Sequence, residues 1–410
     1  MSLRIAQIAQ DWTINGGLAG YVRDLVAALE AAGHEVAVVH ADEPAGGVPG
    51  RQRYQVPRFA EFCDGPEAEE RSRRVLEILE RFRPDVVHVQ CNDNFVLDAA
   101  IRVRYPAVRT LHVYDFCPTG NKFHYALDRP CDHPTGWACV PRMAYKRCTR
   151  DKRPHVWWRF YRRAIAANAN NAAYAAVLVA SEYVRRQALA SGYPPAQVRT
   201  LPHFTVLPQA IPPPPVHPGT MLFCGRLSPE KGLDLLLRAA ARLDRPWRLL
   251  VAGDGMERGP AEHLARRLGV ADRVEFRGWT DRAALSALYA NAAVVAVPSR
   301  WPEPFGIVGL EAMSHGRPVV AFAVGGIPEW LDDGVNGFLI RPYDIEELAD
   351  RLQELLDAPE RARTMGERGR ARVEHDFTAA RHVDRLLAIY EETGGAWRGA
   401  TRRSTEAQNR

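Results

Sequence analysis

The chain has 410 residues, of which 46% are hydrophobic and 25% are charged, with 54 Lys and Arg against 49 Asp and Glu. These values are close to the average for soluble globular proteins and exclude a disordered, collagen-like or coiled-coil chain. No stretch approaches the roughly 18 uncharged apolar residues of a membrane-spanning helix. Residues 1–6 run into a strand pattern without a cleavable signal, so we expect a cytoplasmic protein.

Short apolar runs alternate with helical patterns through the first half of the chain. Apolar spacing predicts helices at 21–32 and 71–82, and apolar runs predict strands at 4–9, 35–40, 85–90, 108–113 and 176–180. Strands and helices in this order form βαβ units on a parallel sheet. The first half is therefore predicted to be an α/β domain.

A proline-rich segment at 202–218 separates this half from a second one of the same kind. It contains Pro212-Pro213-Pro214-Pro215, which suits a semi-rigid connector. We place an N-terminal domain at 1–208 and a C-terminal domain at 209–378, followed by a helix at 379–398 and a disordered tail at 399–410. The second domain is predicted to contain strands at 220–224, 247–252, 274–276, 294–297, 318–321 and 337–340.

Ligands of open α/β sheets bind beyond the carboxyl ends of the strands, so the strand-to-helix loops are the places to search. Gly16-Gly17 suits either a close backbone approach to a ligand or a plain turn. The loop 225–232 places Arg226 and Lys231 at a helix start, which favours an anion clamp over a solvated charge pair. Residues 253–255 (GDG) favour a tight turn over a dinucleotide site, because the full GxGxxG pattern is absent.

The loop at 298–312 (PSRWPEPFGIVGLEA) carries the most specific pattern. It places Glu303 before a helix that begins near Gly306 and Glu311 inside that helix. Eight helical residues rise roughly 12 Å, whereas a hydrolytic carboxylate pair needs about 5 to 9.5 Å, so this is no glycosidase pair. The N–H groups of 305–308 lie between the two carboxylates, where they can receive an anion.

These loops resemble the retaining GT-B glycosyltransferases of family 4 over nearly the whole chain. GRLSPEKG, VAGDG, VEFRGW, VPSRWPEPFG and EAMSHGRPVVAFAVGGIPE follow each other in the family's order, and Glu303-x7-Glu311 is the most specific motif. The resemblance implies an α/β fold of two Rossmann-like domains whose parallel sheets face each other across a cleft. It also implies a nucleotide-sugar donor in the C-terminal domain and an acceptor in the N-terminal one.

The resemblance further implies a role for each residue of the donor site. Arg226 and Lys231 would hold the diphosphate, Glu311 the ribose hydroxyls and Glu303 a hydroxyl of the donor sugar. The remaining donor-site residues would contribute backbone; they are Gly16 and Gly17 at the diphosphate, Trp279 at the nucleobase, and Phe305, Gly306, Ile307 and Val308 at the sugar or diphosphate. On their own, Glu303 and Glu311 could be solvated helix charges, but their place within PEPFGIVGLEA argues against that interpretation.

On the acceptor side, the resemblance places His112 near the reacting carbon, with Tyr114 and Asp115 beside it. On the residues alone, an ordinary sheet-end histidine is the favoured interpretation of His112. Asp115 either orients His112 or caps a turn. We therefore predict catalytic roles for His112, Glu303, Arg226 and Lys231.

The predicted activity is transfer of a sugar from a nucleotide-diphosphate sugar to a hydroxyl acceptor, with retention of configuration. The acceptor would be a lipid-linked saccharide, a polysaccharide precursor or a secondary metabolite. Fixed cations can replace a metal ion in stabilising the departing diphosphate, and we expect no cofactor. The alternatives are a nucleotide-sugar hydrolase or epimerase of the same fold and a non-catalytic nucleotide-sugar-binding protein.

Four of the seven cysteines fall in an insert at about 116–150, namely Cys117, Cys131, Cys139 and Cys148. Their spacing lacks the close Cys-x2-Cys pairs of common zinc sites. His124 and His133 would add ligands. The cluster is thus either a structural metal site or a set of free thiols, and the insert is expected to shape the acceptor pocket.

A basic and aromatic stretch follows at 142–163. It holds nine Arg and Lys side chains against Asp151 alone, interrupted by Trp157 and Trp158. A solvated helix face and stacking on single-stranded nucleic acid are alternatives. We favour peripheral contact with an anionic membrane surface and expect no nucleic acid partner.

Overall fold

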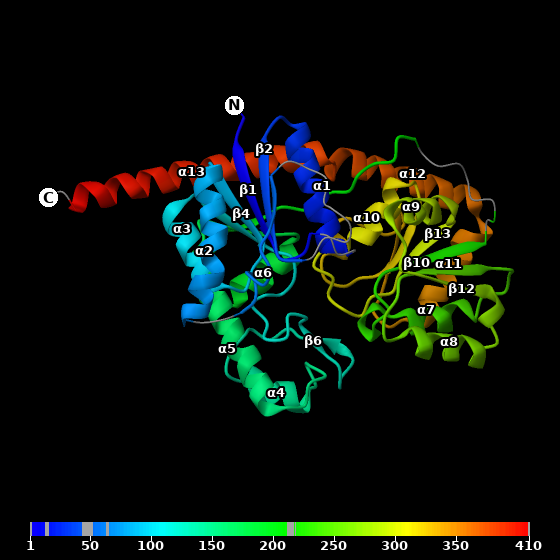
Figure 1. Cartoon of the computed structure of the whole chain (residues 1–410). Coiled ribbons are helices and arrows are strands. Elements are labelled where there is room, and N and C mark those ends of the chain that lie inside the picture. The colour runs from blue at the N-terminus through cyan, green and yellow to red at the C-terminus, as the bar shows by residue number, and fades with distance from the viewer. Residues whose placement is uncertain are drawn as a thin grey trace. The chain divides into compact units, whose positions relative to one another are not determined.

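The computed structural model describes residues 2–12, 16–42, 52–62, 65–210, 217 and 219–408, with side chains through residue 398. The chain forms two compact units (Figure 1). The first consists of Met1–Leu127, Cys131–Pro202 and Ala379–Arg410, and the second of Asp128–Pro130 and His203–Thr378. The chain passes between the units after Leu127, Pro130, Pro202 and Thr378, against predicted boundaries after 208 and 378. The tetraproline run lies outside the described residues.

A seven-stranded parallel sheet forms the centre of the first unit. Its strand order is β3(Arg53–Gln55), β2(Glu35–His40), β1(Arg4–Ala9), β4(Val86–Cys91), β5(Ala107–Leu111), β8(Ala176–Val179) and β9(Val198–Thr200). Parallel strands covered on both faces are near-continuous apolar runs, and β1, β4 and β5 are buried along almost their whole length. The short edge strands β3 and β9 carry too few residues to show a pattern, and the sequence did not predict them.

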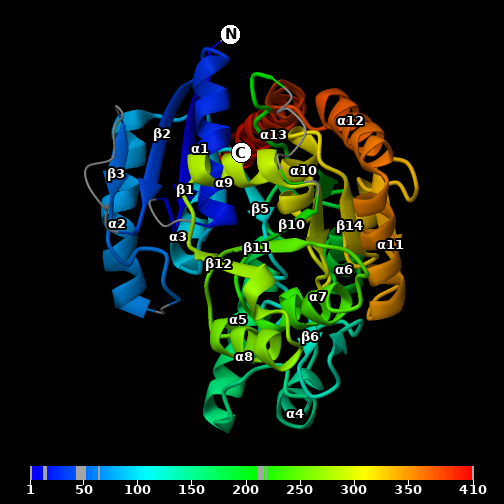
Figure 2. The ribbon, with the colours of Figure 1, turned by 90° about the vertical axis from the view of Figure 1, so that its right-hand side faces the viewer.

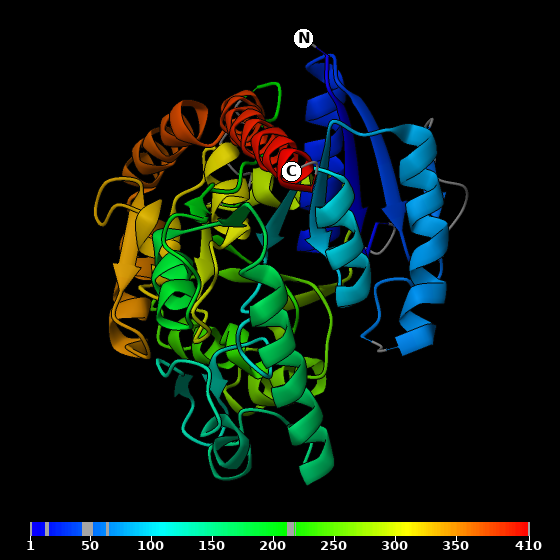
Figure 3. The same cartoon turned by 90° about the vertical axis from the view of Figure 1, so that its left-hand side faces the viewer.

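Helices cover both faces of this sheet. They are α1(Gly17–Ala31), α2(Gly65–Phe82), α3(Phe95–Arg104), α5(Pro154–Asn171), α6(Glu182–Ala190) and α13(Ala379–Gln408). Helix α2 packs on α3 (Figure 3), and α13 packs on α1 and β5. The insert contributes β6(Phe123–His124) and α4(Cys139–Tyr145) to this unit, and α4 lies against α5. Strand β7(Arg129–Pro130) of the insert belongs to the second unit.

Helix α13 differs from its prediction at its C-terminal end. The backbone is helical through Gln408, where the sequence analysis expected a disordered tail from residue 399. Residues 401–408 (TRRSTEAQ) contain neither Gly nor Pro. Arg, Glu, Ala and Gln are good helix formers, so nothing in this segment stops a helix that has already begun.

The second unit is built on a six-stranded parallel sheet. Its order is β12(Val274–Gly278), β11(Arg248–Ala252), β10(Thr220–Cys224), β13(Val294–Val297), β14(Val319–Phe322) and β15(Gly337–Ile340). The helices are α7(Leu233–Ala240), α8(Arg258–Arg267), α9(Arg282–Asn291), α10(Ile307–Ser314), α11(Ile345–Asp357) and α12(Pro359–Asp376), with short 3-10 turns η1(Pro229–Lys231), η2(Ala271–Arg273) and η3(Ile327–Glu329). Figure 2 shows α11 and α12 on the side of β14, where α11 packs on that strand.

Strand order reverses once in each sheet, between β1 and β4 and between β10 and β13. Such switch points open a crevice at the carboxyl ends of the strands. Helices α1, α7 and α10 follow β1, β10 and β13, and each begins after a glycine without a side-chain cap. In contrast, α3, α6, α9 and α11 are capped by a side-chain oxygen. The uncapped helix N-termini therefore stand beside the switch points.

Candidate functional site

In the second unit, the loops after β10 and β13 meet at the switch point. The backbone N–H groups of Arg300 and Trp301 donate to the carbonyl oxygen of Glu230 at 2.8 and 3.1 Å. The hydroxyl of Ser299 donates to the same oxygen at 3.3 Å. These bonds fix the loop that carries Lys231 to the loop that carries Glu303.

Lys231 and Glu303 form an ion pair between these loops. Nζ of Lys231 lies 2.6 Å from Oε1 of Glu303, and the Ser299 hydroxyl donates to that same oxygen at 2.8 Å. Glu303 is 6% exposed, so its charge depends on these partners. Nζ of Lys231 also lies 5.1 Å from the ring centroid of Trp301, within cation–π range.

Two glycines permit this close approach of backbones. Gly232 has a φ of +71°, and a Cβ there would lie 3.0 Å from the carbonyl carbon of Pro298 and closer still to its oxygen. Gly325 has a φ of +59°, and a Cβ there would lie 2.5 Å from the backbone nitrogen of Glu303. The N–H of Gly326 then donates to the Glu303 carbonyl at 2.8 Å.

Helix α10 presents its N-terminus at the end of the second loop. It begins after Gly306, whose φ of +88° is in the left-handed region and which offers no side-chain cap. Trp330 holds this turn, because its Nε1 donates to the Phe305 carbonyl at 2.6 Å. Its ring fills the space where a Cβ at Gly309 would lie, within 2.6 Å of Cζ2. An uncapped helix N-terminus held in this way favours an anion.

Glu311 lies in α10 and is half-buried. The Tyr289 hydroxyl donates to its Oε2 at 2.8 Å, and the Tyr289 ring stacks on His315. Burial first, and then the negative potential of Cys224 and Glu311, raise the pKa of Tyr289 well above its ordinary value. Tyr289 therefore remains a hydrogen-bond donor and holds one oxygen of Glu311.

Arg226 and Trp279 are both exposed, and the Trp279 side chain is 61% exposed. Within the described part of the chain, the Arg226 guanidinium has no hydrogen bond or ion pair. Arg226 is thus a cation without a carboxylate partner there, in contrast to Lys231. Gly306 is half-buried and Phe305 is buried against His203 and Phe377, so the Phe305 side chain is not available to a ligand.

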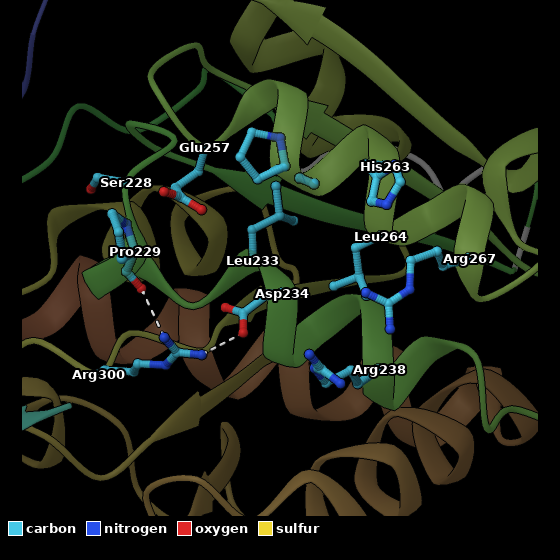
Figure 4. Close-up of a pocket in the computed structure, with 12 residues that line it drawn as sticks. Ser228, Pro229, Leu233, Asp234, Arg238, Glu257, His263, Leu264, Arg267 and Arg300 are labelled. Atoms are coloured by element: carbon cyan, nitrogen blue, oxygen red, sulfur yellow. Dashed lines mark hydrogen bonds and ion pairs between the residues drawn. The ribbon is translucent and has the colours of Figure 1, made fainter. Parts of the chain in front are cut away.

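A cavity of about 350 Å³ lies behind the two loops, between η1, α7 and α8 (Figure 4). Ser228, Pro229 and Arg300 line it, but none of the predicted donor residues does. The guanidinium of Arg300 reaches the carboxylate of Asp234 at 2.5 Å and the carbonyl of Pro229 at 3.4 Å. We therefore do not assign this cavity to donor binding. Arg300 serves to connect the two loops through its contacts with Pro229 and Asp234.

In the first unit, the loop after β1 ends at Gly16 and Gly17. A Cβ at either position would meet nothing within 4 Å. Gly16 precedes α1, which carries no acidic residue in its first turn. The space above this helix N-terminus is therefore open within the described residues.

His112 is the first residue after β5 and is half-buried. Its Nε2 lies 2.8 Å from Oε1 of Gln90, and the Tyr21 ring meets its ring edge-on with centroids 5.3 Å apart. Burial, with the positive potential of His88 and Arg109, lowers the pKa of His112 to about 3. The imidazole is therefore neutral at neutral pH.

The predicted acceptor-side residues differ from each other. Asp115 pairs with Arg109, with Oδ2 and Nη2 3.3 Å apart, and burial raises the pKa of its carboxyl. Tyr114 is fully buried and packs on Phe116. Its side chain is part of the core, so we do not carry Tyr114 into the site.

The cysteines of the insert are free thiols. His124 Nδ1 lies 3.1 Å from the Cys148 sulfur, and burial raises the pKa of Cys148 to about 12. Across the described residues, no group of three or more His, Cys, Asp or Glu could hold a metal ion. The insert therefore supplies no support for the metal alternative.

Two family profiles match the chain. Residues 15–206 match Glycosyltransferase Family 4, and residues 209–372 match Glycosyl transferases group 1. Together the two profiles cover most of the chain. The chain belongs to the group 1, family 4 glycosyltransferases.

Curated relatives of this family 4 glycosyltransferase match part of it. A D-inositol 3-phosphate glycosyltransferase of Mycolicibacterium smegmatis is 43% identical over 183 residues, 43% of this chain and 41% of the relative. An alpha-D-kanosaminyltransferase of Streptomyces kanamyceticus is 34% identical over 177 residues, 42% of this chain and 46% of the relative. The chain thus matches less than half the length of these relatives.

Solved structures match the glycosyltransferase over nearly its whole length. Sucrose-phosphate synthase from Thermosynechococcus elongatus has a TM-score of 0.72 at 23% identity and covers 96% of this chain and 100% of its own. Anabaena HepE in complex with UDP and glucose has a TM-score of 0.71 at 20% identity, covering 95% and 100%. The predicted GT-B, α/β fold is confirmed.

Sequence reasoning missed the residues that support the loops after β10 and β13 and helix α10. They are Tyr289, Ser299, Gly325 and Trp330. Gly325 falls in EAMSHGRPVVAFAVGGIPE, a segment that was matched to the family without any role for this residue, and Trp330 directly follows that segment. The described helices provide none that is long and apolar enough to cross a bilayer.

Proposed function

We propose that this protein transfers a sugar from a nucleoside-diphosphate sugar to a hydroxyl acceptor, with retention of configuration and without a metal ion. The observation that carries the proposal is the Lys231–Glu303 pair, 2.6 Å apart at the β10–β13 switch point. The family membership supports it, as do the names of the relatives, which describe sugar transfer. Anabaena HepE supports a nucleotide-sugar donor, because it was solved with UDP-glucose.

In this proposal, the second unit binds the donor. Lys231, Arg226 and the N-terminus of α10 receive the diphosphate, and Glu311 receives the ribose hydroxyls. Glu303 accepts a hydrogen bond from a hydroxyl of the sugar. Because Lys231 and Glu303 already touch, each remains partnered when the donor enters, and neither charge is left alone in a buried place.

The transfer step exchanges one bond for another at the anomeric carbon. Its bond to the diphosphate oxygen breaks, and the electron pair stays with the diphosphate. The acceptor oxygen bonds to the same carbon, and its proton leaves with the diphosphate. Fixed cations and helix N–H groups stabilise the charge that builds on the leaving group, which is the work a metal ion does in other enzymes.

In the first unit, we propose that His112 contacts the sugar as a neutral imidazole. With a pKa lowered to about 3, it cannot act as a cation at neutral pH. It orients a hydroxyl by hydrogen bonding instead of transferring a proton. Asp115 is held by its ion pair with Arg109. We therefore place it behind His112 and not in contact with the sugar.

Calorimetric titration with UDP, GDP, ADP, TDP and CDP in EDTA tests the donor site. We expect one nucleotide to bind, and Glu311→Ala to weaken that binding at least tenfold, about the free energy of hydrogen bonds to a charged group. Glu367→Ala is the matched control, because Glu367 pairs with Arg363 on the exposed face of α12. Absence of binding by all five nucleotides to the folded protein would overturn the donor site.

Activity with the donor so identified separates the alternatives. Sugar transfer that requires an added hydroxyl acceptor supports the proposal, and the anomeric coupling constant of the product reports retention. Release of sugar without any acceptor would indicate a hydrolase or epimerase. Tight binding without turnover would indicate a binding protein. Activity that is lost in EDTA and restored by Mg²⁺ would refute metal independence.

We also propose that the surface around α4 and α5 rests on an anionic membrane. Trp137, Tyr145 and Trp158 are 77%, 63% and 55% exposed. Exposed basic side chains surround them at Arg147, Arg150, Lys152, Arg153, Arg159 and Arg162. Exposed aromatic rings beside cations are favourable at the headgroup level of an anionic bilayer.

Sedimentation with vesicles tests this surface. We expect binding to vesicles with 30% phosphatidylglycerol, little binding to pure phosphatidylcholine, and a decrease as salt rises. Trp137→Ser with Trp158→Ser should reduce binding. Trp279→Ser, which removes an equally exposed indole from the second unit, should not. Equal loss in both variants would contradict the assignment.

A further inference from the structure

A buried chain of hydrogen bonds connects His112 to the C-terminal helix within the first unit. His112 Nε2 meets Gln90 Oε1 at 2.8 Å. Gln90 Nε2 donates to Gln7 Oε1 at 2.9 Å, and Gln7 Nε2 donates to the Tyr390 hydroxyl at 3.4 Å. The chain thus runs from the end of β5 through β4 and β1 to α13.

The far end of this chain is closed by two further groups. The Tyr390 hydroxyl lies 2.6 Å from His88 Nδ1, and His88 Nε2 lies 2.7 Å from the Thr110 hydroxyl. Gln7, His88, Gln90 and Tyr390 are each at most 2% exposed. Water cannot replace a missing partner at such a place, so the loss of one group leaves others unsatisfied.

A second path joins His112 to α13 through an aromatic ring. The Tyr21 ring meets His112 edge-on, and the Tyr21 hydroxyl lies 2.9 Å from His382 Nε2. His382 Nδ1 lies 2.8 Å from the Pro202 carbonyl oxygen. Because a carbonyl only accepts, Nδ1 of His382 carries the proton and Nε2 accepts from Tyr21.

The direction of the first chain decides which nitrogen of His112 carries its proton. Gln90 Oε1 accepts, so Nε2 of His112 donates and its Nδ1 is the acceptor nitrogen of the ring. The Tyr390 hydroxyl accepts from Gln7 and can donate to His88, which keeps both amides in this orientation. Without that hydroxyl, the amides of Gln7 and Gln90 could turn over together. Gln90 would then donate to Nε2, and the His112 proton would move to Nδ1.

We propose that Tyr390 and His382 of α13 are positioning residues that fix the tautomer and the orientation of His112, so that its Nδ1 accepts a hydrogen bond from a hydroxyl of the bound sugar. The role toward the sugar rests on the proposed function. The two contacts differ in what they fix. Tyr390 sets the tautomer through the amides, and His382 sets the ring position through Tyr21.

Tyr390→Phe removes one hydroxyl and keeps the ring. The 15N shifts of the histidine ring, recorded without substrate, report the tautomer, and the His112 signal is assigned by its loss in His112→Asn. We expect the Nδ1-protonated form of His112 to appear and kcat to fall about three- to tenfold, the range for one neutral hydrogen bond. The KM for the donor should change less than kcat, because the side chains proposed to hold the diphosphate and the ribose, Lys231, Arg226 and Glu311, lie in the second unit.

Tyr193→Phe is the matched control. It also removes a buried hydroxyl, one that is bonded to Asn171 at 3.1 Å and is not part of this chain. An unchanged tautomer in Tyr390→Phe, or an equal change in Tyr193→Phe, would overturn the proposal. A shifted tautomer with unchanged kcat would overturn the role in positioning. The NMR measurement needs no turnover, so failure of the proposed function is distinguished from failure of this inference.

His382→Gln tests the second path separately. It should lower kcat by a similar factor while leaving the His112 tautomer as in the wild type, since the Gln90 contact remains. An unchanged kcat in a variant that melts within a few degrees of the wild type would remove His382 from the proposal. A shifted tautomer would show that the two paths are not separate, and would overturn the division of roles.

Discussion

Replacement of Gly325 by alanine should displace the backbone of Glu303 without changing the side chain of any residue proposed to bind the donor. A Cβ at Gly325 would lie 2.5 Å from the Glu303 nitrogen, whereas ordinary contacts begin at 3.4 Å. The backbone of Glu303 must therefore move by about 1 Å. Alanine at a φ of +59° adds a cost of roughly 1–2 kcal/mol.

Gly269→Ala provides the matched control for this backbone cost. Gly269 has a φ of +70°, and a Cβ there would meet nothing within 4 Å. Both variants should lose about 1–2 kcal/mol of unfolding free energy from the left-handed conformation. Only Gly325→Ala adds the clash. The difference between the two variants then reports the displacement of the Glu303 loop.

The assay combines urea unfolding with calorimetric titration of the nucleotide that the wild type binds and with initial rates of transfer. A displacement of about 1 Å in a positioning group can cost about a hundredfold in rate. We expect kcat to fall at least tenfold in Gly325→Ala and to stay within twofold in Gly269→Ala. Equal rates in the two variants would refute the view that this contact positions Glu303.

Three further outcomes are expected. Trp330→Phe removes the donor to a buried carbonyl oxygen and should lower the unfolding free energy by about 1–3 kcal/mol in urea titration. Lys231→Met leaves its buried partner Glu303 without a cation, so it should lower both the melting temperature and the nucleotide affinity. Arg226→Met changes an exposed side chain and should lower the nucleotide affinity alone. Burial lowers the pKa of His88 to about 3 and of His382 to about 4, whereas the unfolded chain takes up these protons near pH 6.5. Each histidine should therefore lower the unfolding free energy by about 2 kcal/mol as the pH falls from 7.5 to 5. Urea unfolding across this range measures that loss. An unfolding free energy that does not change with pH would contradict the view that both histidines are buried and neutral.

The sequence was sufficient to predict the two sheets and the loops that carry the donor residues. Apolar runs mark parallel strands, and the charged and glycine-rich loops directly follow them. Helix α7 begins only at Leu233, because Gly232 adopts a left-handed conformation against Pro298. That contact joins two loops 66 residues apart and leaves no local trace.

The supports of the site lay beyond sequence reasoning for the same reason. Glu303 was predicted to contact the donor sugar, but its bond to Lys231 spans 72 residues. From the sequence alone, Trp330 cannot be distinguished from an ordinary core residue. The structure shows that its ring packs against Gly309. Tyr114 was predicted on the acceptor side, but its side chain is fully buried and packs on Phe116.

The bond between Gln7 and Tyr390 spans 383 residues, and this has a consequence during synthesis. The strands of the first unit are complete once residue 200 has been made, but the partner of Gln7 and His88 is made about 190 residues later. At ribosomal rates of 5–20 residues per second, the delay is about 10 to 40 s. During that time the surface of the nascent first unit that α13 later covers, over β5, is exposed to solvent. Gln7 and His88 then lack their hydrogen-bond partner Tyr390. A chain that terminates before α13 would keep this surface exposed.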